Sequence, residues 1–329
     1  MDDLILLDSS RHELGRTYAV TDFEIGIGSA ANDFEMKLYS DEVDSGGVYI
    51  PNTEFGGLIQ KVTIYSGEIT TLAEGYTWRG LLNKAIIEPP EGEIAYVANG
   101  DANTILRNTL GNLFGGLFVI PQESSGLTIS NYEFPSYCTL LQGWVDMLDE
   151  YDYRLDIRAA KPLPGEPVIV IVQAVPVTTL NAPFNEDNRL SMTLVQNGMG
   201  INHLIVLGAG EDPDREIMDL YIDGDGQVTS TPYYTGVYER TAVYDAGSAT
   251  GEELFDKGEE QIYELCDTKE LKITDANVDL YIGDRILATY TATDPRYNDW
   301  NMSMVASVNK IVLKTEGGSH SIEYSVEEI

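Results

Sequence analysis

Apolar and polar residues alternate along the first 75 residues of the chain, the pattern of half-buried β-strands. Residues 23–27, 34–38 and 59–64 all show this period of two. The last of them is followed by a Ser-Gly turn and a return strand over residues 69–72, which together predict a β-hairpin.

After this hairpin the apolar spacing changes to three and four residues. Trp78, Leu81, Leu82 and Ile86 repeat at that interval, which predicts a short helix with one buried face. The double proline at positions 89 and 90 cannot continue a helix, so the helix should end before it.

Residues 93–180 predict a small α/β unit, inserted between two β-rich parts. Asp101 is placed to cap a helix over 102–114, and Ser136 to cap a second helix with an apolar inner face. Two strands are predicted after these helices, at 153–158 and 167–175.

From residue 181 the chain returns to strand patterns. Strands are predicted at 204–207, 220–222, 227–229, 278–290, 302–314 and 321–326. One helix interrupts them: Thr250 and Glu253 form a capping-box pattern, and the apolar face of the helix is predicted to consist of Leu254, Gly258, Ile262 and Leu265.

An internal similarity suggests a duplication. Segment 59–64 matches 308–313 position by position, and each is followed by a Gly-containing turn and a return strand. A duplicated β domain would produce this match, and so would chance, because short strands share few residue types.

The predicted fold is therefore β-rich α+β, with two related β-barrel-like domains, an inserted small α/β domain and a short helical decoration. The predicted segments are 1–92, 93–180 and 181–329. The start of segment 181–329 is available to complete the first barrel, and the same segment carries the helix at 251–267.

The charge of the chain excludes several functions. With 54 acidic and 20 basic side chains, the formal net charge is −34, so the surface repels nucleic-acid phosphates and anionic lipid. The same sign fits a lumen through which DNA slides without binding. The longest apolar run, residues 168–172, is far too short to span a membrane, so no membrane insertion is expected.

The residue types that catalyse reactions are few and scattered. The three histidines, His12, His203 and His320, lie in separate segments and form no zinc-protease motif. Cys138 and Cys266 make neither a disulfide framework nor a metal pattern. Both are predicted to lie in apolar helical surroundings, where a cysteine is inert.

Three further motifs favour turns over chemistry. Residues 26–28 lack the third glycine of a dinucleotide loop, and residues 223–226 lack the ligand spacing of an EF-hand. Residues 318–321 place a serine beside a histidine, but adjacent strand residues point to opposite faces. No catalytic, cofactor-binding or metal-binding residue is predicted.

Several stretches, in order, resemble the tail-hub proteins of long-tailed phages. Residues 59–75 are similar to that family's "IxxVxxxxGxITLxG" hairpin, and residues 78–87 to its "RxLLxxLxxRxI" helix. Residues 202–211, followed by Arg215, resemble its "GxGE…R" run, and residues 278–286 its late "GDxV" strand. The family is similar to the baseplate hub of contractile phages and to the N-terminal hub region of tail-associated lysins.

This resemblance implies a structural, non-enzymatic protein of the virion. Hub proteins form homotrimers in which two similar domains per chain make a pseudo-sixfold ring. Such a ring adapts the tail tube to a central spike or fibre, and it gates the passage of the tape measure protein and DNA. The implied partners are a distal tail or tail tube protein, the tape measure protein and the spike or fibre. The implied location is the tail tip, after assembly in the host cytoplasm.

Two other functions stay open on the sequence. A tail-associated cell-wall hydrolase would need convergent carboxylates or a Cys-His pair in a concave site. A carbohydrate-binding adhesion module would need an exposed aromatic platform, for example at Tyr233-Tyr234 or at residues 297–300.

Overall fold

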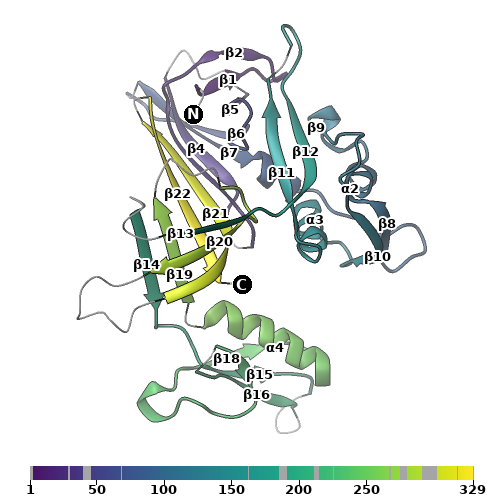
Figure 1. Cartoon of the computed structure of the whole chain (residues 1–329), viewed down its shortest axis with the longest axis vertical. Helices are drawn as coiled ribbons and strands as arrows, with labels where there is room; N and C mark the ends of the chain where they lie inside the picture. The colour runs from purple at the N-terminus through teal and green to yellow at the C-terminus, as the bar shows by residue number, and fades with distance from the viewer. Residues whose placement is uncertain are drawn as a thin grey trace. The chain divides into compact units, whose positions relative to one another are not determined.

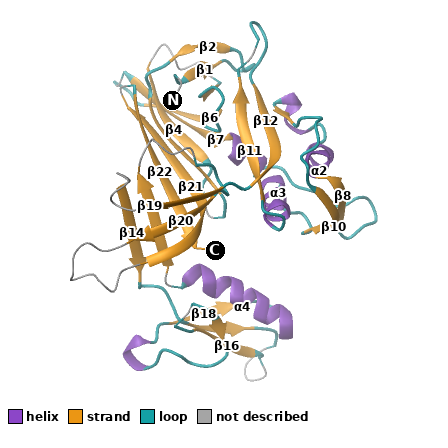
Figure 2. Ribbon diagram, in the orientation of Figure 1, coloured by secondary structure: helices purple, strands orange, loops and turns teal. Residues whose placement is uncertain are grey.

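The computed structural model describes residues 3–28, 30–39, 46–67, 69–161, 163–184, 191–210, 215–224, 226–266, 268–274, 280–290, 302–316 and 318–328. The chain divides into two compact units. Unit 1 contains Met1–Thr193 and Lys272–Ile329, and unit 2 contains Leu194–Leu271. Strands dominate the described residues, with four α-helices among them (Figures 1 and 2). The predicted β-rich α+β class is confirmed.

The largest sheet has thirteen strands in the order β14-β19-β22-β21-β3-β4-β7-β6-β5-β1-β2, with β20 and β13 branching from β21. Its strands are β1 (Ile5–Leu7), β2 (Glu13–Arg16), β3 (Val20–Gly26), β4 (Asp33–Tyr39), β5 (Gly47–Tyr49), β6 (Gly56–Ile64), β7 (Thr70–Thr77), β13 (Thr179–Phe184), β14 (Ser191–Asn197), β19 (Thr268–Thr274), β20 (Arg285–Tyr290), β21 (Met302–Glu316) and β22 (Ser319–Glu328).

The two ends of the sequence meet in this sheet. Strand β21 pairs antiparallel with β3, so the C-terminal hairpin β21–β22 lies beside the N-terminal strands (Figure 1). The alternation read from the sequence orients β3 and β4 correctly, but it was wrong for the end of β6, where Val62 and Ile64 are exposed. Phe23, Phe34, Met36 and Leu38 are buried on one face, while the intervening residues of β4 are exposed.

The two hairpins that share the internal similarity, β6–β7 and β21–β22, both belong to this sheet. Strands β3 and β4 lie between the two hairpins in the order of the sheet. The duplication itself, and the domain boundaries at residues 92 and 180, stay predictions.

The helix after β7 is shorter than its apolar spacing predicted. Helix α1 spans Trp78–Leu82, and Thr77 caps it by accepting a hydrogen bond from the Gly80 backbone N–H. Ile86, predicted on its inner face, lies beyond the helix and is exposed. The chain leaves the helix at Asn83, well before the double proline.

The next part of unit 1 is an α/β layer that packs on α1. Its elements are β8 (Tyr96–Asp101), α2 (Ala102–Leu110), the 3-10 turn η1 (Leu113–Gly116), β9 (Phe118–Val119), β10 (Thr128–Phe134), α3 (Leu140–Asp149), β11 (Tyr153–Ala160) and β12 (Ile169–Pro176). β10 pairs with β8, and β11, β12 and β9 form a three-stranded sheet.

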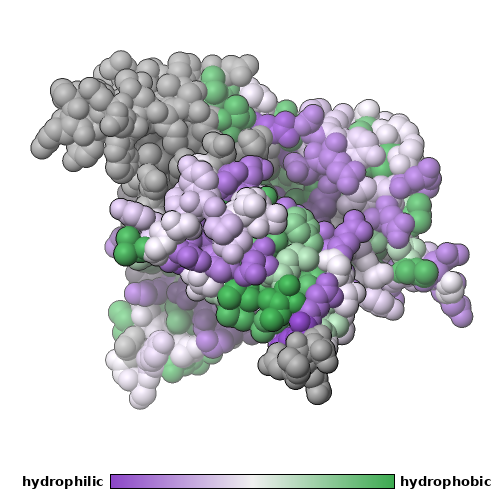
Figure 3. Space-filling view, turned by 90° about the horizontal axis from the view of Figure 1, so that it is seen from below, coloured by the Kyte–Doolittle hydropathy of each residue, from purple (hydrophilic) through white to green (hydrophobic). Residues whose placement is uncertain are grey.

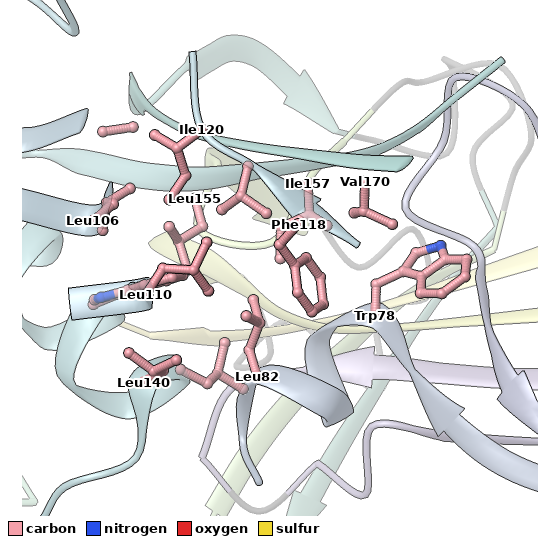
Figure 4. Close-up of a cluster of buried hydrophobic side chains, with 14 of the residues drawn as sticks. Trp78, Leu82, Leu106, Leu110, Phe118, Ile120, Leu140, Leu155, Ile157 and Val170 are labelled. Carbon is pink, nitrogen blue, oxygen red and sulfur yellow. The ribbon is translucent and has the colours of Figure 1, made fainter. Parts of the chain in front are cut away.

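One continuous core joins this layer to the large sheet. Trp78 and Leu82 from α1 pack with Leu110 from α2 and with Ile157 and Val170 from β11 and β12 (Figure 4). At about 25 cal/mol for each Å² of apolar surface removed from water, a cluster of this size holds the α/β layer firmly against the sheet.

Of the two helix caps predicted for this layer, one is confirmed and the other was wrong. Asp101 caps α2 as predicted, since its side chain accepts a hydrogen bond from the Thr104 N–H at 3.4 Å. The predicted cap of α3 was wrong. Thr139 caps that helix, and the Ser136 hydroxyl instead donates to the carbonyl of Ile94.

Unit 2 is a small two-layer α/β fold. Its sheet has the order β17-β16-β15-β18, formed by β15 (His203–Leu207), β16 (Ile217–Ile222), β17 (Val228–Thr229) and β18 (Thr241–Asp245). The 3-10 turn η3 (Gly236–Tyr238) precedes β18. The predicted hairpin around residues 223–226 is confirmed by the antiparallel pairing of β16 and β17.

Helix α4 (Gly251–Leu265) covers one face of the unit 2 sheet through Leu254, Gly258 and Ile262, as predicted. Two predictions for this helix were wrong. Thr250 occupies the N-cap position but makes no side-chain capping bond, and Leu265 is exposed. None of the helices among the described residues has the length and hydropathy needed to cross a bilayer.

Candidate assembly surfaces

The outward face of the large sheet carries a continuous row of carboxylates. Asp22 on β3 lies opposite Glu35 on β4, and Glu35 lies opposite Glu74 on β7. Like charges directly opposite each other on a sheet face are destabilising. Lysines offset this repulsion at the two ends of the row, because Lys314 contacts Asp22 at 3.2 Å and Lys61 contacts Glu74 at 2.5 Å.

A second pair of carboxylates extends this acidic row. Burial raises the pKa of Asp33 on β4, and the nearby charge of Glu24, followed by those of Asp22 and Glu74, raises it further. The five carboxylates thus act on one another, which makes this face unsuited to a phosphate or to another acidic surface.

The same strands end in exposed apolar side chains, which we call the apolar end. Its members are Tyr18, Tyr39, Ile64, Tyr65 and Ile69. Ile64 and Ile69 flank the β6–β7 turn and are 71% and 77% exposed. Large apolar side chains that gather at one exposed place mark a contact surface more often than chance. On the face of the molecule drawn in Figure 3, apolar residues likewise reach the surface in separate groups among hydrophilic ones.

A cavity of about 380 Å³ lies within unit 1, between the α/β layer and the large sheet. Arg79 from α1 and Arg154 from β11 line it, and both are buried. Glu54 binds Arg79 through both of its oxygens, at 2.6 and 3.2 Å. Asp284 binds the Nε of Arg154 at 2.7 Å.

The remaining charged groups of this cavity are acids. Asp146 and Asp149 project from α3, and Glu327 comes from β22. Burial raises the pKa of Asp146; a hydrogen bond from Gln142 opposes this effect, and the charge of Asp149 adds to it. The lining contains no histidine and no cysteine, so the nucleophile–base pairs that use those residues have no place in it.

The histidines named from the sequence lie apart: His12 in the connection between β1 and β2, His203 on β15 and His320 on β22. Of the three, His203 has side-chain partners at both ring nitrogens: its Nε2 contacts Asp219 at 2.9 Å and its Nδ1 contacts Glu239 at 2.8 Å. Its ring stacks on Tyr221 with centroids 4.3 Å apart. The contacts fix the ring on both sides, which is the arrangement of a structural histidine.

Neither cysteine forms a disulfide among the described residues, and neither lies inside a helix, contrary to the expectation of helical surroundings. Cys138 precedes α3, and Cys266 is the residue after α4. Burial raises the pKa of the Cys138 thiol, and the nearby Asp146 charge raises it further. The thiol therefore stays protonated near neutral pH and is a poor nucleophile.

The turn at residues 223–226 and the two aromatic segments are the remaining sites named from the sequence. Asp223 accepts a hydrogen bond from the Gln227 N–H at 2.9 Å within its turn, and no metal-binding group of three acidic, His or Cys residues occurs in the described part of the chain. Tyr233 and Tyr234 meet edge to face at 4.9 Å, with Tyr233 exposed. Residues 297–300 lie outside the described ranges.

Sequence reasoning missed the cavity and its buried arginines. One signal was present: Arg154, Asp156 and Arg158 alternate with apolar residues along β11, so opposite charges share one side of the strand. Buried charges are nearly always paired, so such positions indicate partners elsewhere. The identity of those partners depends on the tertiary fold.

The fold described above is similar to that of a solved phage tail protein. Over 99% of this chain and 98% of the other, it matches the 43 kDa tail protein of prophage MuSo2 from Shewanella oneidensis, with a TM-score of 0.54 and 10% sequence identity. A tail protein from Neisseria meningitidis MC58 matches with a TM-score of 0.48 and 13% identity, over 99% of this chain and 95% of that one.

A chain of the phage P2 baseplate in its activated conformation matches with a TM-score of 0.44 and 10% identity, over 99% of both chains. No protein-family model and no curated protein matches the sequence. The similarity to the prophage MuSo2 protein therefore lies in the fold, and the resemblance to phage tail proteins is confirmed at that level.

Proposed function

We propose that this protein is a structural, non-enzymatic hub at the distal end of a phage tail, where three copies form a ring. The observation that carries the proposal is the end-to-end fold match to the prophage MuSo2 tail protein, which leaves almost no part of either chain unmatched. A grafted enzyme domain would leave a large part of this chain unmatched.

The proposed ring joins tube proteins of sixfold symmetry to a threefold spike or fibre. In a homotrimer, each chain contributes two similar hairpin regions, β6–β7 and β21–β22, so three chains present six. The proposed neighbours are the distal tail or tail tube protein above, the spike or fibre below, and the tape measure protein within the lumen.

Charge assigns roles to the surfaces in this proposal. A subunit of net charge −34 can associate with itself only through a contact depleted in acid. The apolar end meets that condition and is our proposed subunit contact. The acidic row across β3, β4 and β7 suits a lumen wall, because it would repel DNA and let it pass during ejection.

The oligomer and its contact can be tested together. Purified virions should contain the protein as a threefold ring at the tail tip in electron micrographs. Changing Ile64 and Ile69 to Asp should remove the ring from the tails, while the monomer keeps the wild-type melting temperature. Ile94→Asp is the matched control, because Ile94 is 87% exposed elsewhere in unit 1.

A protein labelled along the tube, or absent from particles, would contradict the hub. A ring that persists in the Ile64/Ile69 variant would leave the hub standing and remove the apolar end as its contact. The ring's presence and its contact are therefore tested separately.

Cell-wall hydrolysis is the second candidate, because one observation favours it. The cavity of unit 1 brings Asp146, with its raised pKa, into the same lining as Asp149 and Glu327, and glycosidases use a pair of carboxyl groups of this kind. Release of reducing sugar from purified peptidoglycan, lost in Asp146→Asn, would establish this activity and overturn the non-enzymatic proposal.

A further inference from the structure

The sheet of unit 2 has one covered face and one open face. Leu204 and Val206 on β15 and Leu220 on β16 point toward α4 and form the unit's core with Leu254. Residues on the other side of the same strands meet no second layer among the described residues of unit 2.

The register places an apolar stripe on this open face. Ile205 pairs with Val243 on one side, and Leu207 pairs with Ile217 on the other. Val243 is 62% exposed and Ile217 is 55% exposed. Tyr221, stacked on His203, ends the stripe. The open face thus continues across three strands as an uncovered apolar surface.

The stripe reaches an open strand edge. β18 is the last strand in the order β17-β16-β15-β18 and pairs only with β15 among the described strands. An edge strand presents alternate unpaired N–H and C=O groups, and proteins protect such edges with lysine, proline or a bulge. The sequence of β18, Thr-Ala-Val-Tyr-Asp, has none of these devices.

The charge of unit 2 limits which kind of partner could bind this face. Residues 194–271 contain 17 Asp and Glu against 4 Lys and Arg. Asp219 and Asp245 flank the apolar stripe itself. A field of this sign opposes nucleic acid, anionic lipid and a second copy of this acidic chain, and it attracts a basic one.

We propose that unit 2 binds an extended, basic segment of a partner protein, which adds a strand to the free edge of β18. Its backbone would pair with β18. Its apolar side chains would extend the Val243–Ile205 row, and a lysine or arginine beside Asp245 would share that carboxylate with Arg215. Main-chain pairing of this kind supplies affinity, and the alternate side chains supply specificity. The inference does not depend on the trimeric ring.

The test uses the full-length protein and two synthetic peptides of seven residues. One peptide alternates lysine with valine, and the other alternates glutamate with valine. The lysine peptide should bind in calorimetry, and its affinity should fall as salt rises from about 50 to about 300 mM. Hydrogen exchange should slow in residues 241–245.

Two substitutions locate the site. Val243→Asp places a charge in the apolar row and should weaken the lysine peptide at least about tenfold, equivalent to about 1.4 kcal/mol. Tyr263→Asp, on the opposite side of the unit in α4, is the control and should bind as the wild type does. Unchanged melting temperatures establish that both variants fold.

Four results would overturn the proposal. One is no binding of the lysine peptide at about 1 mM, and another is equal binding of the glutamate peptide. The third is self-association of the wild type in sedimentation that Val243→Asp abolishes, which would make a second copy the occupant. Protection of an element other than β18 would place the bound peptide elsewhere and equally remove this site.

Discussion

Removing the carboxylate that holds Arg79 should destabilise unit 1 more than any surface change. Arg79 is 1% exposed and Glu54 is 8% exposed, and their two hydrogen bonds join α1 to the turn before β6. Glu54→Gln keeps the size of the side chain and removes its charge. The guanidinium is then buried without a counter-ion, which costs about 3–5 kcal/mol.

The same reasoning predicts recovery when both charges are removed. In Glu54→Leu/Arg79→Met no buried charge is left uncompensated, and apolar replacement of a buried pair is often neutral or stabilising. Urea unfolding followed by tryptophan fluorescence reports on unit 1, since Trp78 and Trp144 both belong to its core. The single variant should lower the urea midpoint by about 1 M or more.

A cost below about 1 kcal/mol for Glu54→Gln would show that solvent in the cavity compensates Arg79, and it would refute the assumption of a buried charge. A double variant as unstable as the single one would instead show that packing, and not charge, makes this position sensitive. The control is Lys61→Gln, which removes an exposed ion pair and should change the midpoint little.

Three further predictions concern local packing, capping and acid stability. Gly80→Ala should cost unit 1 about 1–3 kcal/mol in urea unfolding, despite alanine's helix propensity, because its Cβ would lie 2.0 Å from the Asn32 carbonyl oxygen; unchanged stability would contradict this contact. Asp101→Ala should cost about 1–2 kcal/mol of stability by removing the α2 cap, whereas Asp101→Asn should keep most of the wild-type stability. Equal losses in the two variants would argue against capping. Burial lowers the pKa of His320, and the nearby N-terminal charge lowers it further. The unfolded chain therefore binds this proton more readily, so stability should fall as pH drops below about 6.5. A His320→Asn variant with the same decline between pH 7.5 and 5.5 would assign it to other groups.

The strands were predictable because their signal is local. A period of two over five or more residues indicates which side chains face the core, and β3 and β4 follow it directly. β15 was predicted from a short, continuous apolar run. The hairpins β6–β7 and β21–β22 add turn residues between two such runs. In each case the information lies within about ten consecutive residues.

The caps and the cavity depend on distant residues and could not be predicted in this way. Ser136 has the right chemistry for a cap, yet its hydroxyl bonds to Ile94, 42 residues earlier. The Arg154–Asp284 pair joins residues 130 positions apart. A single sequence gives no reason to prefer one of 54 acids as the partner of a given arginine.

The acidic row also limits where subunits can touch. Asp22, Glu35 and Glu74 repel one another across adjacent strands, and water screens part of that repulsion. Covering this face with another subunit would remove the water and strengthen the repulsion, unless each carboxylate gained a cation. Most of the chain's cations are needed for its own acids, since it has 20 against 54. In the proposed ring, copies of this chain therefore meet elsewhere, and the apolar end is a part of this sheet where desolvation is favourable.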